Sequence, residues 1–210
     1  MLDVHPPDHG IQGTRDFFLH LFTITIGLLI ALGLEAGVEA LHHRHQREQA
    51  ETLIRQEIQN NLDGLNKAAP VVVEELHQMN QVMDTLQART QSQPGNLRES
   101  EFAFHESPMQ DAAWRTASST GALSLMDYAD VERFSDAYKE QALLQTMEEQ
   151  ALDDYLQLMP ILSHHSEDGS VDPETAKDAL VPTRRIIAHL NGMLDVGQGT
   201  IGAYEEALKK

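Results

Sequence analysis

The chain lacks cysteine and is poor in aromatic and basic residues. None of its 210 residues is cysteine, which excludes disulfides, thiolate catalysis and cysteine-based metal sites. Lys and Arg number 15 against 33 Asp and Glu, so the formal net charge is −18. So acidic a surface repels the phosphate backbone, and we expect no nucleic-acid partner. A basic protein surface remains a possible partner.

Familiar catalytic motifs are also missing. The chain contains no G-x-S-x-G nucleophile elbow, no Walker loop and no H-E-x-x-H zinc motif. We therefore expect no enzymatic activity and no cofactor. What the chain does have is a hydrophobic content of 41% with only 8 prolines. That composition is too apolar for a disordered chain and is typical of packed helices.

The opening apolar run predicts a membrane anchor. Residues 17–34 contain no ionisable side chain other than His20, and a helix of that length covers roughly 27 Å, close to the hydrocarbon thickness of a bilayer. A buried core helix fits less well, because the run is apolar on every face. A cleaved signal peptide also fits less well, since only Arg15 precedes the run and no A-x-A-like site follows it. We expect one uncleaved span.

Small residues recur within and just after this span. Such residues let two helices approach closely in lipid, and a pair of glycines four residues apart is a known dimerisation pattern. The residues at these positions are Thr23, Gly27, Ala31, Gly33 and Gly37. They predict helix–helix packing in the membrane.

The orientation of the span follows from the basic residues beside it. Arg15 flanks one side, whereas Glu35 and Glu39 come first on the other side and Arg44 and Arg47 follow later. A count of basic residues favours a cytoplasmic C-terminal part, but their adjacency to the bilayer favours the opposite. We lean toward a C-terminal domain on the far side of the membrane from the cytoplasm.

The remaining pattern predicts an all-α protein: a single N-terminal transmembrane helix, extended into a long helix and followed by an antiparallel helical bundle. We expect a short tail at 1–16, the anchor at 17–36, a juxtamembrane helix at 37–68 and the bundle at 69–210. A turn at 66–70, with Pro70 in the first turn of the next helix, should reverse the chain. No segment long enough to assign shows the two-residue alternation of a strand.

Two heptad-like seams, of the kind found in coiled coils, lie in the bundle region. Their apolar residues recur at alternating steps of three and four, so they bury a stripe either within the chain or against a partner. The first seam consists of Val72, Leu76, Met79, Met83 and Leu86. The second consists of Ile187, Leu190, Leu194, Ile201, Tyr204 and Leu208, with Gly197 at the step between Leu194 and Ile201.

Local signals place the other helix ends. Ser107 before Pro108, with Gln110 three residues after the serine, predicts a capped short helix that ends near Gly121. Asp127 should begin a long helix. Asp172 before Pro173 should begin another helix, which Pro182 should kink or interrupt.

Two groups of residues are candidates for ligand binding. His42 and His45 share a helical face and are weak candidates for a metal site, because donor types alone do not supply a metal's geometry, and a solvated face is the more common outcome. Trp114, the only tryptophan, stands among alanines. It is either a core anchor or part of the lining of a ligand pocket.

Two stretches of the sequence are similar to a known class of proteins. The anchor "FFLHLFTITIGLLIALGLE" running into "HQREQAETLIRQEIQNNLDGL", together with "AAWRTASSTGALSLMDYADVERFSDAYKEQ", resembles uncharacterised bacterial single-pass membrane proteins with an N-terminal anchor and a helical domain. The resemblance implies a bacterial inner membrane. It brings no catalytic or binding residues with it.

These observations predict a membrane-anchored helical scaffold or accessory subunit. Its partners would be the lipid bilayer and either further copies of itself or other subunits of a membrane complex. The alternative is a membrane-tethered sensor with a ligand-binding helical domain near Trp114.

Overall fold

A computed structural model describes residues 13–97, 104–162 and 170–209. These residues form four α-helices and the 3-10 helix η2, and none of them lies in a β-strand. The only pairing of strand type among them is an isolated bridge between Asn96 and Ser170. The predicted all-α class is confirmed. The chain divides into two compact units, Met1–Glu48 and Gln49–Lys210.

The first unit consists of the beginning of helix α1, which spans Thr14–Thr90. Every residue from Gly13 to His45 is exposed. This part of α1 is long and apolar enough to cross a membrane, and none of its most apolar stretch is buried by the described chain.

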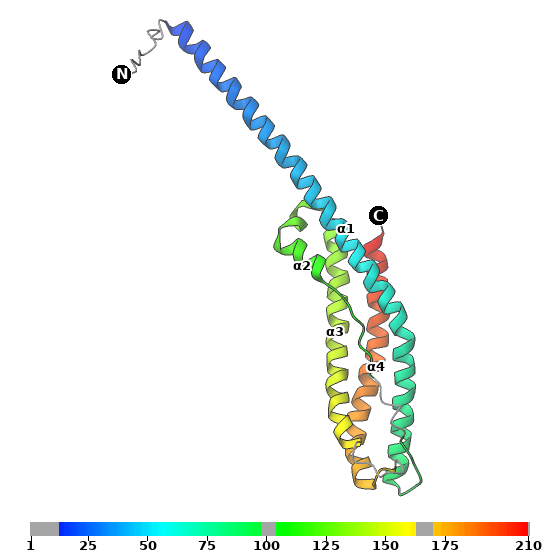
Figure 1. The fold of residues 1–210 in the computed structure, drawn as a ribbon. Helices are drawn as coiled ribbons and strands as arrows, with labels where there is room; N and C mark the ends of the chain where they lie inside the picture. The colour runs from blue at the N-terminus through cyan, green and yellow to red at the C-terminus, as the bar shows by residue number, and fades with distance from the viewer. Residues whose placement is uncertain (1–12, 98–103, 163–169, 210) are drawn as a thin grey trace, which may run out of the picture. The chain divides into compact units, whose positions relative to one another are not determined.

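Helix α1 continues through Pro70, so the predicted reversal of the chain at 66–70 is wrong (Figure 1). A proline inside a helix removes one backbone hydrogen bond and costs about 3 kcal/mol. Here Pro70 is exposed, while Leu65 before it and Val72 after it are both buried. Burial on both sides of the proline holds the helix in one piece. The second unit accordingly begins at Gln49, well before the predicted start of the bundle at 69.

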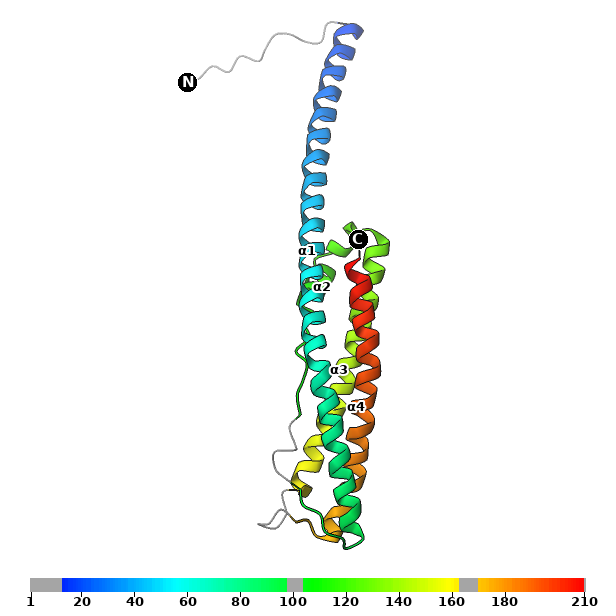
Figure 2. The same ribbon diagram turned by 90° about the vertical axis from the view of Figure 1, so that its right-hand side faces the viewer.

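The second unit is a bundle of three long helices joined partly by extended chain. After α1 come α2 (Ala112–Ser119), η2 (Ala122–Leu125), α3 (Tyr128–Leu162) and α4 (Pro173–Leu208). Helices α3 and α4 lie side by side in opposite directions, whereas α3 and the part of α1 after Gln49 run in the same direction (Figures 1 and 2). They can do so because the chain between them returns as an extended segment, residues 104–111, which we call the strap.

Some of the predicted helix ends agree with the structure and others do not. Asp172 caps α4, and its side chain accepts hydrogen bonds from the backbone N–H groups of Glu174 and Thr175, as the sequence indicates. Helix α3 begins directly after Asp127, as predicted. The interruption predicted at Pro182 is wrong, because α4 continues through it. The start predicted for the short helix at Ser107 is also wrong, because the strap is extended there and α2 begins only at Ala112. Its end at Ser119 lies near Gly121, as predicted.

Buried positions on the long helices follow alternating steps of three and four residues, the spacing of a coiled-coil seam. On α4 every buried residue lies on this pattern: Ala176, Ala179, Thr183, Ile186, Leu190, Met193, Gly197, Thr200, Tyr204 and Ala207. On α3 the same pattern runs from Phe134 through Gln141 and Glu148 to Ala151. The core is therefore a heptad-type seam that includes polar side chains.

Both predicted seams pack inside the second unit. In the first, Val72, Met79, Met83 and Leu86 are buried and Leu76 is half-buried. In the second, Leu190 and Tyr204 are buried, whereas Ile187, Leu194, Ile201 and Leu208 are half-buried. The centre of the buried face of α4 is thus rotated from the predicted stripe toward Ile186, Met193 and Thr200. Two threonines on this face, Thr183 and Thr200, are fully buried but carry no apolar signal.

Candidate functional site

The predicted membrane-packing residues lie on the exposed part of α1. Thr23 donates its hydroxyl hydrogen to the carbonyl of Leu19 within the same helix, at 2.9 Å. A Cβ atom added at Gly27, Gly33 or Gly37 would meet no atom within 4 Å. Ala31 is exposed as well. This surface is open to a second helix.

The predicted metal candidates do not gather a ligand set. His42 and His45 are both exposed on α1, and the neighbouring His43 lies 3.9 Å from the carboxylate of Glu39. Among the residues that the structure describes, no group of three or more histidine, aspartate or glutamate side chains is placed to hold a metal ion.

Trp114 belongs to the packing between α2 and α3. Its ring stacks on that of Tyr138, with centroids 5.2 Å apart and an angle of 18° between the planes. An open groove with a volume of about 400 Å³ borders both rings and also reaches Arg115 and Lys139. Trp114 is therefore half-buried: it stacks on Tyr138 and borders an open groove.

A buried carboxylate on α1 fixes the start of α2. Glu57 accepts a hydrogen bond from the backbone N–H of Ala113 at 2.9 Å and a longer one from Trp114 at 3.4 Å. The first N–H groups of a helix have no partner within the helix and carry partial positive charge, so a carboxylate there is stabilising. The hydroxyl of Tyr138 donates to the same carboxylate at 2.6 Å. Burial, and then this hydrogen bond, raises the pKa of Tyr138 well above its usual value, so the hydroxyl remains a donor.

A layer of amides lies one helical turn further along the bundle. Asn61 on α1 accepts from the backbone N–H of Gln110 at 2.9 Å and donates to the carbonyl of the same residue at 2.7 Å. Gln141 on α3 also donates to that carbonyl, at 3.1 Å, and accepts from the Tyr204 hydroxyl of α4 at 2.7 Å. One strap residue is thus bound by side chains from two helices, and the third helix completes the layer.

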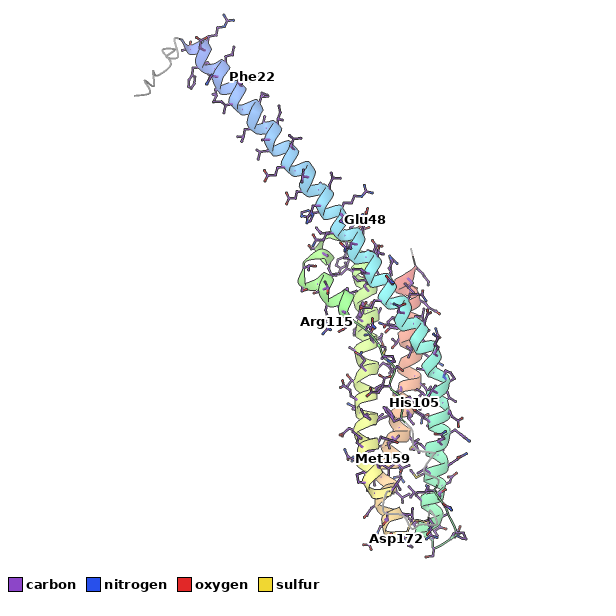
Figure 3. All side chains as sticks on the ribbon, in the orientation of Figure 1. Phe22, Glu48, His105, Arg115, Met159 and Asp172 are labelled. Carbon is purple, nitrogen blue, oxygen red and sulfur yellow. The ribbon has the colours of Figure 1, made fainter. Side chains whose placement is uncertain are left out.

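Two further acidic side chains bind the strap. Glu75 accepts from the backbone N–H of His105 and contacts its ring Nδ1, each at 2.7 Å. Glu148 accepts from the backbone N–H of Ser107 at 3.3 Å. Figure 3 labels His105 near the start of the strap and Arg115 just beyond its end in α2. Side chains of α1 and α3 therefore replace the backbone partners that a helix or a strand would supply.

Sequence reasoning missed most of this polar layer. Glu57, Glu75, Gln141 and Glu148 carry no apolar signal, so the sequence pattern alone does not single them out. The signal that could have found three of them is position: Glu75 falls on the three–four spacing of α1, and Gln141 and Glu148 on that of α3. A polar residue at a seam position predicts a buried hydrogen-bond partner.

The run "GQGTIG" at 197–202 has the glycine spacing of a dinucleotide-binding loop. That loop requires a preceding strand and the start of a helix. Here the run lies in the middle of α4. The structural context of a dinucleotide site is therefore missing.

Comparison of the chain with protein-family models, with curated proteins and with solved structures finds no match. The resemblance to bacterial single-pass membrane proteins stays a prediction. Function is therefore inferred from two features described above: an apolar helix that the described chain leaves uncovered, and a bundle whose seams are already filled.

Proposed function

We propose that the protein is a membrane-anchored helical scaffold or accessory subunit that self-associates or helps to assemble a larger membrane complex. One observation supports this proposal above the others. The large apolar side chains of the first unit are 40–69% exposed, among them Phe22, Leu34 and Leu41. Phe22, labelled in Figure 3, lies in this row. So much continuous apolar surface is stable only when lipid or another protein covers it.

We expect association to occur mainly through the anchor rather than through the bundle. Both predicted seams are filled by the chain's own residues, so they offer little apolar surface to a partner. The small residues Thr23, Gly27, Ala31, Gly33 and Gly37 remain open. In lipid, where apolar surface alone does not drive association, close packing over such residues does. This proposal gives the chain no enzymatic role and no cofactor.

Native mass spectrometry of the protein, extracted gently from its own membrane, tests the proposal. A homo-oligomer of defined number supports self-association, and a stable mass with other chains supports an accessory subunit. In a homo-oligomer, Gly33→Ile and Gly37→Ile together should release monomers, whereas Leu28→Ile and Leu29→Ile on the same helix should not. A wild-type protein that is monomeric and free of other chains contradicts the proposal.

We propose that the membrane is a bacterial inner membrane and that the second unit lies on its periplasmic side. Because the chain has no cysteine, a single Ser118→Cys substitution at an exposed position of α2 gives one reactive thiol. A maleimide that cannot cross the inner membrane should label it in cells with a permeabilised outer membrane. Labelling only after lysis would place the second unit in the cytoplasm.

The second candidate function is a membrane-tethered sensor with a ligand site at Trp114. The groove beside Trp114 and Tyr138 favours it. A ligand entering this groove would change the emission of the only tryptophan, so a screen by intrinsic fluorescence is a direct test. Tyr138→Phe, which keeps the ring stack but removes the hydroxyl, is the matched control.

A further inference from the structure

A second cavity lies between α1, α3 and α4 of the bundle, beside the strap. Its volume is about 210 Å³. Its wall is formed by Leu65, Ala69, Pro70, Val72 and Val73 of α1, Ser107 of the strap, Leu144 and Glu148 of α3, and Met193, Leu194, Gly197, Gln198 and Ile201 of α4. All the elements that carry it belong to the second unit.

The cavity exists because small residues stand where the seam calls for large ones. Gly197 occupies a core position of the α4 seam, and a Cβ atom added there would meet nothing within 4 Å. Gly192, on the same helix, differs: an added Cβ would lie 3.3 Å from the sulfur of Met147. The helices are therefore packed closely at Gly192 and leave a space at Gly197.

Glu148 is the only ionisable side chain in the wall of this cavity. It is 7% exposed, and its hydrogen bond to the Ser107 N–H is 3.3 Å long. The other buried glutamates, Glu57 and Glu75, each accept at least one bond of 2.7 Å or less. Ser107 hydrogen-bonds this carboxyl, but no cationic side chain lines the cavity, so Glu148 lacks the opposite charge that a buried carboxylate requires.

We propose that this cavity binds a small apolar amine, with the ammonium group on the carboxylate of Glu148 and the apolar body against Leu65, Leu144 and Gly197. A lined cavity of about 150 Å³ holds benzene, so the space here suits one ring or a short alkyl body with an amino group. The formal charge of −18 raises the local concentration of cations. The site is independent of the anchor and of the function proposed above.

The site predicts a dependence of binding on pH. Burial raises the pKa of Glu148 to about 7. The charge of Glu106 on the strap also raises the pKa of Glu148, whereas hydrogen bonds from Ser107 lower it. The residues of α1 that line the cavity are not titratable. Below pH 7 an ammonium ion must displace the proton of Glu148, so affinity should fall roughly tenfold for each pH unit.

The experiment measures binding of three ring compounds to the full chain in detergent micelles by isothermal titration calorimetry. Benzylamine, benzyl alcohol and benzoate have similar bodies and differ in charge. We expect benzylamine to bind at pH 8 at least tenfold more tightly than the other two, and to lose most of its affinity at pH 5.5. Glu148→Gln should remove the preference for benzylamine.

Two glycine variants separate this site from binding to micelles or to other surfaces. Gly197→Leu should fill the cavity and abolish binding. Gly202→Leu, which places the same side chain on the exposed face of α4 in open space, should bind benzylamine as the wild type does. Equal binding of benzylamine and benzyl alcohol overturns recognition of the ammonium group. Absence of binding in the wild type, or unchanged binding in Gly197→Leu, overturns the site.

Discussion

The hydroxyl of Tyr138 on α3 donates a hydrogen bond of 2.6 Å to the carboxylate of Glu57 on α1. The same carboxylate accepts from the first backbone N–H groups of α2. One side chain thus joins three helices. Because α2 has no side-chain cap of its own at Asp111, the start of that helix depends on a residue more than fifty positions earlier in the chain.

Removing the carboxylate of Glu57 should destabilise the fold more than removing the hydroxyl of Tyr138. Glu57→Ala leaves the Tyr138 hydroxyl and two backbone donors without a partner and should lower the free energy of unfolding by about 3 kcal/mol. Tyr138→Phe removes one donor and should cost about 1 kcal/mol. Urea unfolding of the full chain, followed by Trp114 fluorescence, measures both. Equal losses in the two variants would contradict the role given to Glu57.

Arg55 should stabilise the end of α4. Its guanidinium donates to the carbonyl of Ala207 at 3.0 Å, lies 3.5 Å from Asp130 and sits over the ring of Phe134 at 5.2 Å. Arg55→Ala should therefore lower the free energy of unfolding by about 2 kcal/mol. Arg55→Lys should lower it by less, but not restore the wild-type value, since lysine lacks the planar guanidinium group that donates several hydrogen bonds.

The same urea titration gives the control for Arg55. Arg115 is paired with Asp111 but is largely exposed, and Arg115→Ala should change the free energy of unfolding by less than about 0.5 kcal/mol. A loss at Arg115 as large as that at Arg55 would show that charge alone, rather than contact with α4, determines the effect.

Glu148 should make the bundle less stable as pH rises. Its pKa is raised by burial to about 7 from an ordinary value of 4.5, so the folded chain holds the proton more tightly than the unfolded chain. Stability from this group is complete below pH 4.5, declines between pH 4.5 and 7, and is lost above pH 7. The decline should be on the order of 2 kcal/mol.

The test for Glu148 compares the wild type with Glu148→Gln at pH 5 and pH 8. The glutamine variant keeps the shape of the side chain but does not titrate, so the difference in unfolding free energy between the two pH values should shrink by the stated amount. If both proteins show the same pH dependence of the unfolding free energy, a group other than Glu148 causes it.

The two glycines of α4 should respond differently to alanine. Alanine is favoured over glycine by about 1 kcal/mol in a helix interior, and Gly197→Ala should gain that amount because its added methyl group enters open space. Gly192→Ala should gain less, because the side chain of Met147 must move. Thermal unfolding followed by circular dichroism compares the Tm of the two variants. An equal rise in Tm would contradict the difference in space between Gly197 and Gly192, and would show that the cavity closes in solution.

Periodicity predicted the helices well where the signal was local and apolar. The start of α4 at Asp172 and the burial of Val72, Met79 and Leu86 could be derived from spacing and capping alone. The extended strap could not, because Ser107 and Gln110 also satisfy the pattern of a capped helix. Only the side chains of Asn61 and Glu148, distant in sequence, show that the backbone N–H groups of the strap have partners outside a helix.

The sequence by itself determined that this chain is all-α and that residues 17–34 form an apolar helix. It also determined that the buried positions of the long helices follow heptad spacing. These properties follow from composition and from contacts between near neighbours in the chain. The tertiary structure alone decided that α1 continues through Pro70, that residues 104–111 form an extended strap, and that Glu148 faces a cavity at Gly197. Each of these depends on packing between segments far apart in sequence, where burial on both sides of a residue outweighs its local preference.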